Sequence, residues 1–456
     1  MGWRRKNMLG IGVAVLMALL PATGTALSPG GGALHRACAG GTADEVLAAL
    51  RAGGDVQARD DSGRTPLMIA ALSSVDPTVV STLLEWGADA ALALPDGRTA
   101  LMMAAARNFN ADIAAALIDG GSDPNGRDTS GATPLMYAAA YNGDSRVLEV
   151  LLDGGADPGA HDASGNSALL YAARNPVGDG ARLLLALGEG RGKNKAGETP
   201  LMLAARGNPN PEVVALFMEE DKDGWAAAFA LALQHNPSLD VAALFLEKGL
   251  PVNGSLPQAG GPLMVAARFN PNPDVISLLV NAGAALDGKD GEGRTALMLA
   301  VAYNENNDVV RRLFDSGADV NLQDKAGETA LMKAARVRRN PWTVRDLAKA
   351  KADVNTRDAS GQTALHHAAA RSDGGAVLIA SLLDREADVE AKDKRGNTPL
   401  LAAAELGTAS SVLALLEAGA DPKAKNGAGE SAAALAAKNP LVKGSDAEER
   451  LKKTAP

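Results

Sequence analysis

The sequence predicts an all-α protein built as a solenoid of stacked helix pairs. The main observation is a block of the type Thr-Pro/Ala-Leu-Met-x-Ala-Ala that returns along the chain at about 34 residues. A fixed period of this length is typical of repeat arrays, and with degenerate copies we expect about 13 units. Clear copies begin at Thr65, Thr99, Thr133, Ser167, Thr199, Thr295, Thr329, Thr363 and Thr398, and degenerate copies lie at 33–38, 227–233, 261–267 and 431–437.

The composition indicates the same fold class. Aromatic residues make up only 3% of the chain, although 46% of its residues are hydrophobic. A chain with so few large side chains cannot fill one large core, whereas stacked helices need only small Ala and Leu interfaces. The single cysteine, Cys38, excludes an intramolecular disulfide, and its place in the first block predicts a small buried side chain.

Each unit can be read as a helix, a short break, a second helix and a turn. Thr65 is suited to cap the first helix, and Pro66 fits its first position. The break usually contains Asn, as at Asn108 and Asn142, which we expect to take a left-handed conformation at the helix end. The second helix ends at a glycine such as Gly87, and an Asp-x-x-Gly turn then leads to the next unit.

Over roughly residues 33–440 these units resemble ankyrin repeats. Thr-Pro-Leu-x-x-Ala-Ala opens the first helix, Leu-Leu-x-x-Gly-Ala-Asp closes the second, and Asp-x-x-Gly marks the tip of a finger. The resemblance implies helix pairs with projecting β-hairpin fingers, and a protein-binding activity without a cofactor. We expect an N-terminal stack at 33–223, a C-terminal stack at 224–440, and a C-terminal cap or tail at 441–456. The pattern departs from the family in having Met where a His is usual, as at Met68, and in its extra residue per unit.

The N-terminus predicts export. Arg4, Arg5 and Lys6 precede the apolar stretch Met8–Leu20, and small residues follow it up to Ala26. This pattern is typical of a cleavable signal peptide at 1–26, and it is too short to span a membrane. We expect residues 27–32 to form a flexible lead-in. The Ala- and Gly-rich composition favours a bacterial source, so the mature chain is expected in the periplasm or outside the cell.

The charge balance argues against two classes of partner. The chain has 45 Lys and Arg against 54 Asp and Glu. Cleavage removes three positive charges, which leaves 45 − 3 = 42 against 54, a net charge of −12. Such a chain is poorly suited to bind nucleic acid or an anionic membrane, and we expect no stable membrane insertion after cleavage.

No pattern of catalytic residues emerges. Phosphate-binding loops, HExxH and Gly-x-Ser-x-Gly are absent from the sequence, so we expect no enzyme, no cofactor and no metal site. The recurrent Met residues could bind copper(I) or consume oxidants, but a flexible thioether also fills gaps between stacked helices. We favour the packing interpretation. The adjacent His366 and His367 point to different faces of a helix, which disfavours a shared metal.

Candidate partner-binding residues lie mainly just after the Ala-Ala pair of the first helices. In an acidic protein this edge is basic and aromatic, and Arg and Tyr are favoured at binding hot spots. Each Arg could instead only close its own helix or pair with a finger Asp. The candidates are Arg107, Tyr141, Arg174, Arg206, Arg268, Phe269, Tyr303, Arg336, Arg338, Arg339 and Arg371, with Trp86 near a finger base.

The period is broken once. Thr199 and Ala227 are separated by only 28 residues, and the segment between them lacks most of a finger. This irregularity is either a trimmed loop within one continuous stack or a hinge between two arms.

The expected function is a non-enzymatic scaffold in the bacterial periplasm that binds a protein partner with an acidic patch. One alternative is an accessory protein that supports a periplasmic peroxide-defence enzyme, as exported bacterial ankyrin proteins similar to this chain are thought to do. A second alternative is a secreted effector that binds a host protein.

Overall fold

The computed structural model describes residues 32–188, 190–256, 260–337, 343, 346–347 and 352–454. The expected signal peptide therefore lies outside the described residues. Over these ranges the chain is helical, and it divides into two compact units, Met1–Pro200 and Leu201–Pro456. The expected boundary between 223 and 224 lies within the second unit, and the division of the stack there stays a prediction.

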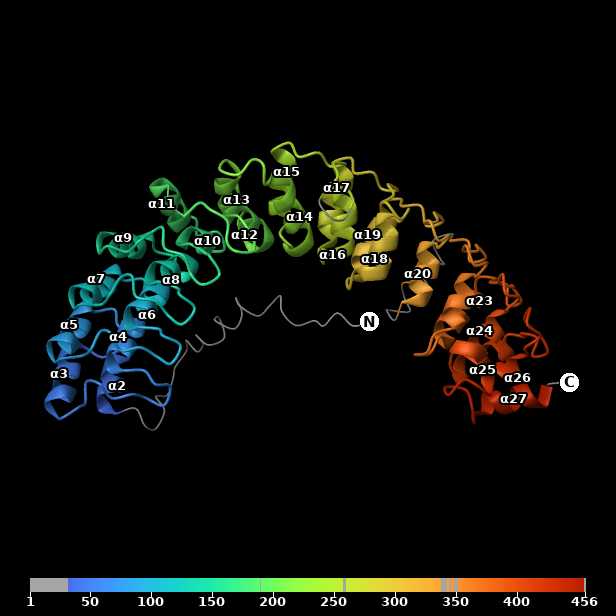
Figure 1. Ribbon diagram of the computed structural model, residues 1–456, viewed down its shortest axis with the longest axis horizontal. Helices are drawn as coiled ribbons and strands as arrows, with labels where there is room; N and C mark the ends of the chain where they lie inside the picture. The colour runs from blue at the N-terminus through green and yellow to red at the C-terminus, as the bar shows by residue number, and fades with distance from the viewer. Residues whose placement is uncertain are drawn as a thin grey trace. The chain divides into compact units, whose positions relative to one another are not determined.

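Unit 1 consists of two layers of helices. Successive first helices pack side by side, and so do successive second helices (Figure 1). The first helices are α2 (Ala33–Cys38), α4 (Pro66–Ser73), α6 (Ala100–Arg107), α8 (Pro134–Tyr141) and α10 (Ala168–Ala172). The second helices are α3 (Ala43–Arg51), α5 (Pro77–Glu85), α7 (Ala111–Asp119), α9 (Ser145–Asp153) and α11 (Asp179–Leu187).

Unit 2 repeats this arrangement after α12 (Pro200–Gly207), which begins at the unit boundary. The first helices that follow are α14 (Trp225–His235), α16 (Pro262–Phe269), α18 (Ala296–Tyr303), α20 (Ala330–Arg336), α22 (Ala364–Ala369), α24 (Pro399–Leu406) and α26 (Ala432–Ala436). The second helices are α13 (Pro211–Met218), α15 (Leu239–Glu247), α17 (Pro273–Asn281), α19 (Asn307–Asp315), α23 (Ala376–Leu383), α25 (Ala409–Glu417) and α27 (Asp446–Thr454). The number of repeats stays a prediction.

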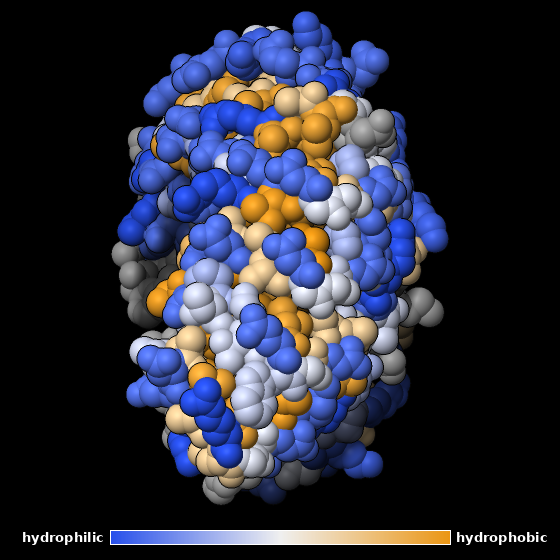
Figure 2. Space-filling model, turned by 90° about the vertical axis from the view of Figure 1, so that its left-hand side faces the viewer, coloured by the Kyte–Doolittle hydropathy of each residue, from blue (hydrophilic) through white to orange (hydrophobic). Residues whose placement is uncertain are grey.

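The recurrent block starts the first helices as expected. The hydroxyl of Thr133 caps α8 by accepting from the backbone N–H of Met136 at 3.5 Å, and Pro134 takes the first helical position. Such a cap contributes about 1 kcal/mol because it satisfies a backbone donor that the helix itself cannot. Leu135, Ala138 and Ala139 of α8 are buried between neighbouring first helices. Hydrophilic side chains with smaller apolar patches between them form the face in Figure 2, as expected of helices that keep one side in solvent.

Methionine lacks a cross-repeat hydrogen bond that histidine makes at the same position elsewhere in the chain. His366 accepts from the backbone N–H of Thr363 at Nδ1, and its Nε2–H donates to the carbonyl of Asn397 in the next repeat at 3.0 Å. Burial lowers the pKa of His366 and keeps its ring neutral. Met136 places its sulfur 3.5 Å from the N–H of Thr133 but has no donor to reach the next repeat. Successive Met residues therefore fill space, which is the packing role expected for them.

A series of buried Asn side chains, which we call the Asn ladder, supplies the cross-repeat bonds instead. The Nδ2 of Asn142 donates to the carbonyls of Ala105 and Asn108, both in the preceding repeat, at 2.9 and 3.0 Å. Its backbone is extended, with φ −87° and ψ 136°, so the expectation of a left-handed Asn is wrong. The same pair of donated hydrogen bonds recurs at Asn108, Asn175, Asn236, Asn270, Asn304 and Asn439.

The segments between helix pairs are turns with tightly bonded tips. The Oδ1 of Asp128 accepts from two backbone N–H groups of its own turn at 2.8 Å. Gly131 follows at a left-handed φ of 81°, where a Cβ would lie 3.1 Å from the backbone nitrogen of Ala163 in the next turn. That same N–H donates to the carbonyl of Ser130 at 2.9 Å, so neighbouring tips are linked through their backbones.

The expected β-hairpin fingers are not confirmed. No β-strand forms over the ranges that the structure describes, and pairing is limited to isolated antiparallel bridges. In the turn at Asp128, for example, the Asp128 N–H donates to the carbonyl of Ala132, and α8 begins two residues later at Pro134. The bridges are Ala93–Thr99, Leu256–Gly260 and Lys425–Ser431.

The irregular junction is a short turn at 219–224 between α13 and α14. The indole N–H of Trp225 donates to the carbonyl of Met218 at 2.7 Å and ties the two helix ends together.

We predict that residues 219–228 exchange amide hydrogens faster than the corresponding helix ends and turns of Thr99–Thr133 and Thr295–Thr329. The reason is that a unit without a full finger has a weaker interface with its neighbours, and local opening follows the weakest interface. Hydrogen-exchange mass spectrometry on the full chain measures this directly. Equal protection in all three segments would leave a continuous stack with a trimmed loop.

Candidate protein-binding surface

Four of the predicted candidates come together in unit 2 and form what we call the unit 2 strip: Arg268, Phe269, Tyr303 and Arg336. The guanidinium carbon of Arg268 lies 4.8 Å from the ring centroid of Phe269 and 4.4 Å from that of Tyr303. Both distances are within the range of cation–π attraction. Arg268 thus joins the exposed aromatic side chains at the ends of α16 and α18.

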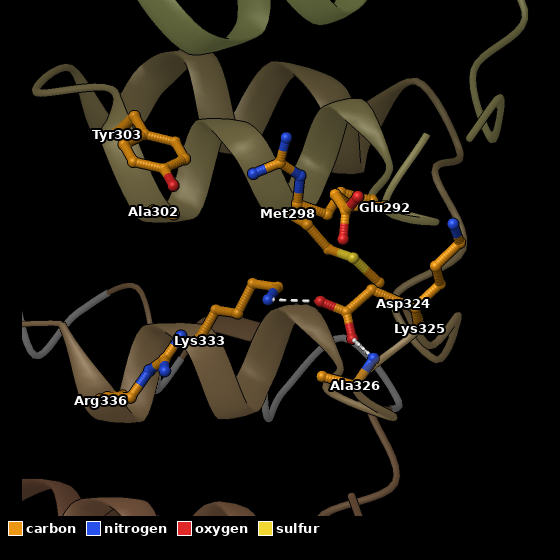
Figure 3. Close-up of a pocket in the computed structure, with 10 residues that line it drawn as sticks. Glu292, Met298, Ala302, Tyr303, Asp324, Lys325, Ala326, Lys333 and Arg336 are labelled. Atoms are coloured by element: carbon orange, nitrogen blue, oxygen red, sulfur yellow. Dashed lines mark hydrogen bonds and ion pairs between the residues drawn. The ribbon is translucent and has the colours of Figure 1, made fainter. Parts of the chain in front are cut away.

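A pocket of about 240 Å³ adjoins this strip between α18 and α20. Figure 3 shows Tyr303 and Arg336 at one end of it, while Glu292, Asp324 and Lys325 lie at the other end, on the turns. The wall also includes Arg294, Met298, Ala302, Ala326 and Lys333. The pocket therefore combines an aromatic ring, an apolar wall and charges of both signs.

The floor of the pocket is a buried ion cluster. The Nζ of Lys333 lies 2.6 Å from Asp324 Oδ2 and 2.6 Å from Glu328 Oε2, and only 7% of its side chain is exposed. Arg336 also pairs with Glu328 at 3.2 Å, but 57% of its side chain remains exposed. Burial alone would raise the pKa of Asp324, but the hydrogen bond and charge of Lys333, with backbone donors, hold that pKa below its usual value. Lys333 is therefore structural, while Arg336 remains accessible to a partner.

Unit 1 carries three more of the candidates at corresponding helix ends. Arg174 is exposed, whereas Arg107 and Tyr141 are half-buried. The ring of Tyr141 lies 6.3 Å from that of Tyr137, whose hydroxyl donates to the Asp128 carboxylate at 2.8 Å. Burial raises the pKa of Tyr141, although the charge of Arg174 opposes it. These residues line one edge of unit 1 without the stacked arrangement seen around Arg268.

The remaining candidates lie in other surroundings. Arg206 is half-buried at the end of α12. Burial of His235 lowers the pKa of that histidine, and the charge of Arg206 lowers it further. Trp86 is exposed at the C-terminal end of α5. Arg338 and Arg339 lie outside the described residues.

Arg371 differs from the expectation of an exposed contact residue. Only 8% of its side chain is exposed. Its Nη1 donates to the carbonyls of Ala335 and Val337, and its Nη2 pairs with Asp373 at 2.8 Å. The guanidinium thus occupies the place that Asn takes in the Asn ladder, and it holds two repeats together.

Sequence reasoning missed exposed apolar residues in the loops between the first and second helices of unit 1. Val75 is 84% exposed, Phe109 63% and Val177 40%. The signal available in the sequence was an apolar residue just after the break: Val75 and Phe109 follow the break residue directly, and Val177 comes one position later, after Asn175-Pro176. Nothing in a single unit distinguishes such a residue from a buried one.

A metal or catalytic role gains no support. No group of three or more His, Cys, Asp or Glu side chains gathers within the described ranges. Cys38 is buried, and burial raises its pKa to about 12, which suppresses its reactivity as a thiolate. None of the described helices combines the length and apolar character that a membrane crossing requires.

The repeated helix pairs, the bonded turn tips and the exposed helix ends define a class of stacked-repeat interaction protein. Family comparison identifies the class: a model described as ankyrin repeats (3 copies) matches the chain in overlapping segments that together cover residues 74–426. The chain therefore belongs to the ankyrin-repeat family, whose domains are typically non-enzymatic modules that bind proteins. The matched segments are 74–162, 101–189, 138–224, 169–255, 229–324, 263–358 and 331–426. A comparison with curated proteins finds no match.

Proposed function

We propose that this chain is a non-enzymatic scaffold, exported to the bacterial periplasm, that binds a protein partner through the unit 2 strip. The observation that supports this role best is the contact of Arg268 with two exposed rings beside a pocket. Cation–π contact restrains all three side chains before a partner arrives, which lowers the entropy that binding must remove.

The proposed partner presents an acidic and partly apolar surface. Arg336 is largely exposed at the same end of the pocket as Tyr303, and Lys325 is exposed at the far end. A carboxylate of the partner can pair with Arg336 in two parallel hydrogen bonds while an apolar group lies on the Tyr303 ring. The opposite charges of Glu292 and Asp324 restrict which acidic surfaces fit, and this favours specificity over general attraction.

Replacing Tyr303 and Arg336 together with Ala should weaken partner binding at least about 30-fold, which corresponds to about 2 kcal/mol. The partner is captured from envelope extract by the mature chain, identified by mass spectrometry and titrated by calorimetry. The matched control is the double variant Arg146→Ala and Leu187→Ala, which removes an exposed arginine and an exposed apolar residue from unit 1. If both double variants keep full affinity while folded, the unit 2 strip is not the binding surface.

Export has its own test. The basic residues before Met8–Leu20 and the small residues near Ala26 predict cleavage, so the mature protein should begin close to Leu27. N-terminal sequencing of protein from the periplasmic fraction measures this. Full-length protein with an intact Met1 in the cytosol would contradict the proposed location.

The two alternative functions keep the same fold and differ in the partner. A peroxide-removing enzyme among the captured proteins, lost from the Tyr303 and Arg336 variant, would favour the accessory role in peroxide defence. Recovery of the protein in the medium around intact cells would favour the secreted effector. Neither alternative requires chemistry from this chain.

A further inference from the structure

The loops between the first and second helices of unit 1 present a row of residues that we call the apolar row: the exposed Val75, Phe109 and Val177, with the half-buried Gly143 between Phe109 and Val177. The row is continuous at its centre. A Cβ placed on Gly143 would lie 3.7 Å from Phe109 Cε1 and 3.6 Å from Val177 Cγ2. Gly143 is therefore the floor of a narrow notch, about one methyl group wide, between two exposed apolar side chains.

The backbone beneath the apolar row is fixed by side-chain amides. Asn108 Nδ2 donates to the carbonyl of Ser74 at 2.8 Å, and Asn110 Nδ2 donates to that of Val75 at 2.9 Å. Asn142 continues the series by donating to the carbonyl of Asn108. Because the loops are held in this way, the exposure of Val75 and Phe109 is a defined feature of the surface. The part of the row from Phe109 to Val177 is contiguous across Gly143, and contiguous exposed apolar surface can mark an interaction site.

The spacing of the row matches an α-helix lying along it. Each repeat contributes one position, and neighbouring packed helices lie about 8–10 Å apart. Seven residues of an α-helix rise about 10.5 Å at 1.5 Å per residue. A helix along the row therefore places every seventh residue over a successive repeat. Four repeats accommodate about 22 residues, with one apolar side chain of the partner entering the notch at Gly143.

The charges beside the row indicate one edge of that helix. The second helices begin next to the row with Asp76, Asp112, Asp144 and Asp179. Asp144 and Asp179 already pair with Arg146 and Arg182. In the part of the chain that the structure describes, Asp76 and Asp112 make no ion pair, although Asp76 accepts hydrogen bonds from Thr78 and Asp112 lies within the electrostatic reach of Arg146. Both lie at the end of the row near Val75 and Phe109. Basic residues of a partner can pair with them there.

We propose that the apolar row of unit 1 is a second docking surface, distinct from the unit 2 strip, and that it binds an amphipathic helix. The helix carries apolar residues at every seventh position and lysine or arginine along the edge that faces the second helices. The opposite edge faces the ends of the first helices, where Arg107 and Arg174 lie, and carries uncharged polar residues.

The probe is a synthetic 22-residue helical peptide with leucine on its apolar face, lysine on one edge and glutamine on the other, measured by fluorescence anisotropy on the full mature chain. The proposal expects micromolar binding, and at least tenfold weaker binding when glutamate replaces lysine. Substituting Val75→Ser and Phe109→Ser together should weaken binding at least tenfold. Gly143→Trp, which fills the notch from an ordinary backbone conformation, should do the same.

The control is Val377→Ser, which removes an exposed apolar residue from unit 2 and should leave the affinity for the peptide unchanged. Circular dichroism establishes that each variant is folded. The proposal is overturned if the lysine-edged peptide fails to bind at millimolar concentration, if the glutamate-edged peptide binds equally well, or if both row variants keep full affinity. Because Tyr303 and Arg336 are intact in these variants, failure of this proposal is distinguishable from failure of the unit 2 strip.

Discussion

Replacing Lys333 with Met should lower the free energy of unfolding by about 3–5 kcal/mol at neutral pH, because it leaves buried carboxylates without their cation. Asp324 and Glu328 both lie 2.6 Å from the Lys333 ammonium, and both carboxylates are almost completely buried. Met has a similar length and volume, so the loss reflects charge and not a cavity. The control Lys325→Met removes an exposed lysine next to the same pocket and should change stability by less than about 0.5 kcal/mol.

The effect of the Lys333 substitution should depend on pH. In the natural chain the pKa of Asp324 is lowered, so its contribution to stability is present above the unfolded pKa of about 3.9 and is lost as the pH falls through the folded pKa. In the variant, burial without a cation raises the pKa of that carboxyl, and acid pH relieves the cost by protonating it. Urea unfolding followed by circular dichroism at pH 7.5 and at pH 4.5 should show a smaller difference between the two proteins at pH 4.5. A difference that is equal at both values would exclude an electrostatic origin.

Replacing Asn142 with Ala should lower the free energy of unfolding by about 2–4 kcal/mol, because buried hydrogen-bonding groups lose their partner. The side-chain amide of Asn142 donates hydrogen bonds to the carbonyls of Ala105 and Asn108, and its oxygen accepts from the N–H of Asp144 at 3.0 Å. Water cannot replace these bonds in the buried interface between repeats. The measurement is urea unfolding of the full chain.

Asn125 provides a matched control for the Asn142 substitution. Its Nδ2 donates to the carbonyl of Gly155 at 2.8 Å, and its Oδ1 accepts from the N–H of Asp157 at 2.8 Å. These are also cross-repeat bonds, but the side chain is exposed and water can take its place. Asn125→Ala should therefore cost no more than about 1 kcal/mol. Equal losses at the two sites would mean that burial does not determine the strength of the Asn ladder.

Much of the repeat architecture could be predicted because each unit carries local signals. A capping Thr before Pro or Ala, an Ala-Leu face and a left-handed Gly each depend on only a few neighbouring residues, and α8 begins at Pro134 as those rules require. The helix-end position of Tyr303 and Arg336 followed from the same period. Their exposure is found in the structure, and their role in binding remains a proposal.

The features that could not be predicted depend on contacts between repeats. Asn142 looks like an ordinary helix stop in its own unit, and only the preceding repeat supplies the carbonyls it binds. Arg371 resembles the other helix-end arginines, yet the repeat before it draws the guanidinium inward. Lys333 occupies the place of a Tyr in α8, and its burial is possible only because Asp324 and Glu328 face it. In each case the sequence spacing is visible, but the direction of the side chain is not.

Amide hydrogen exchange of the full mature chain, with and without its captured partner, tests the proposed binding role most directly. Binding through the unit 2 strip predicts slower exchange at the C-terminal ends of α16, α18 and α20, where Phe269, Tyr303 and Arg336 lie. The protection should disappear in the Tyr303→Ala and Arg336→Ala double variant. Protection confined to unit 1, with unchanged exchange at these three helix ends, would contradict the assignment of the binding surface.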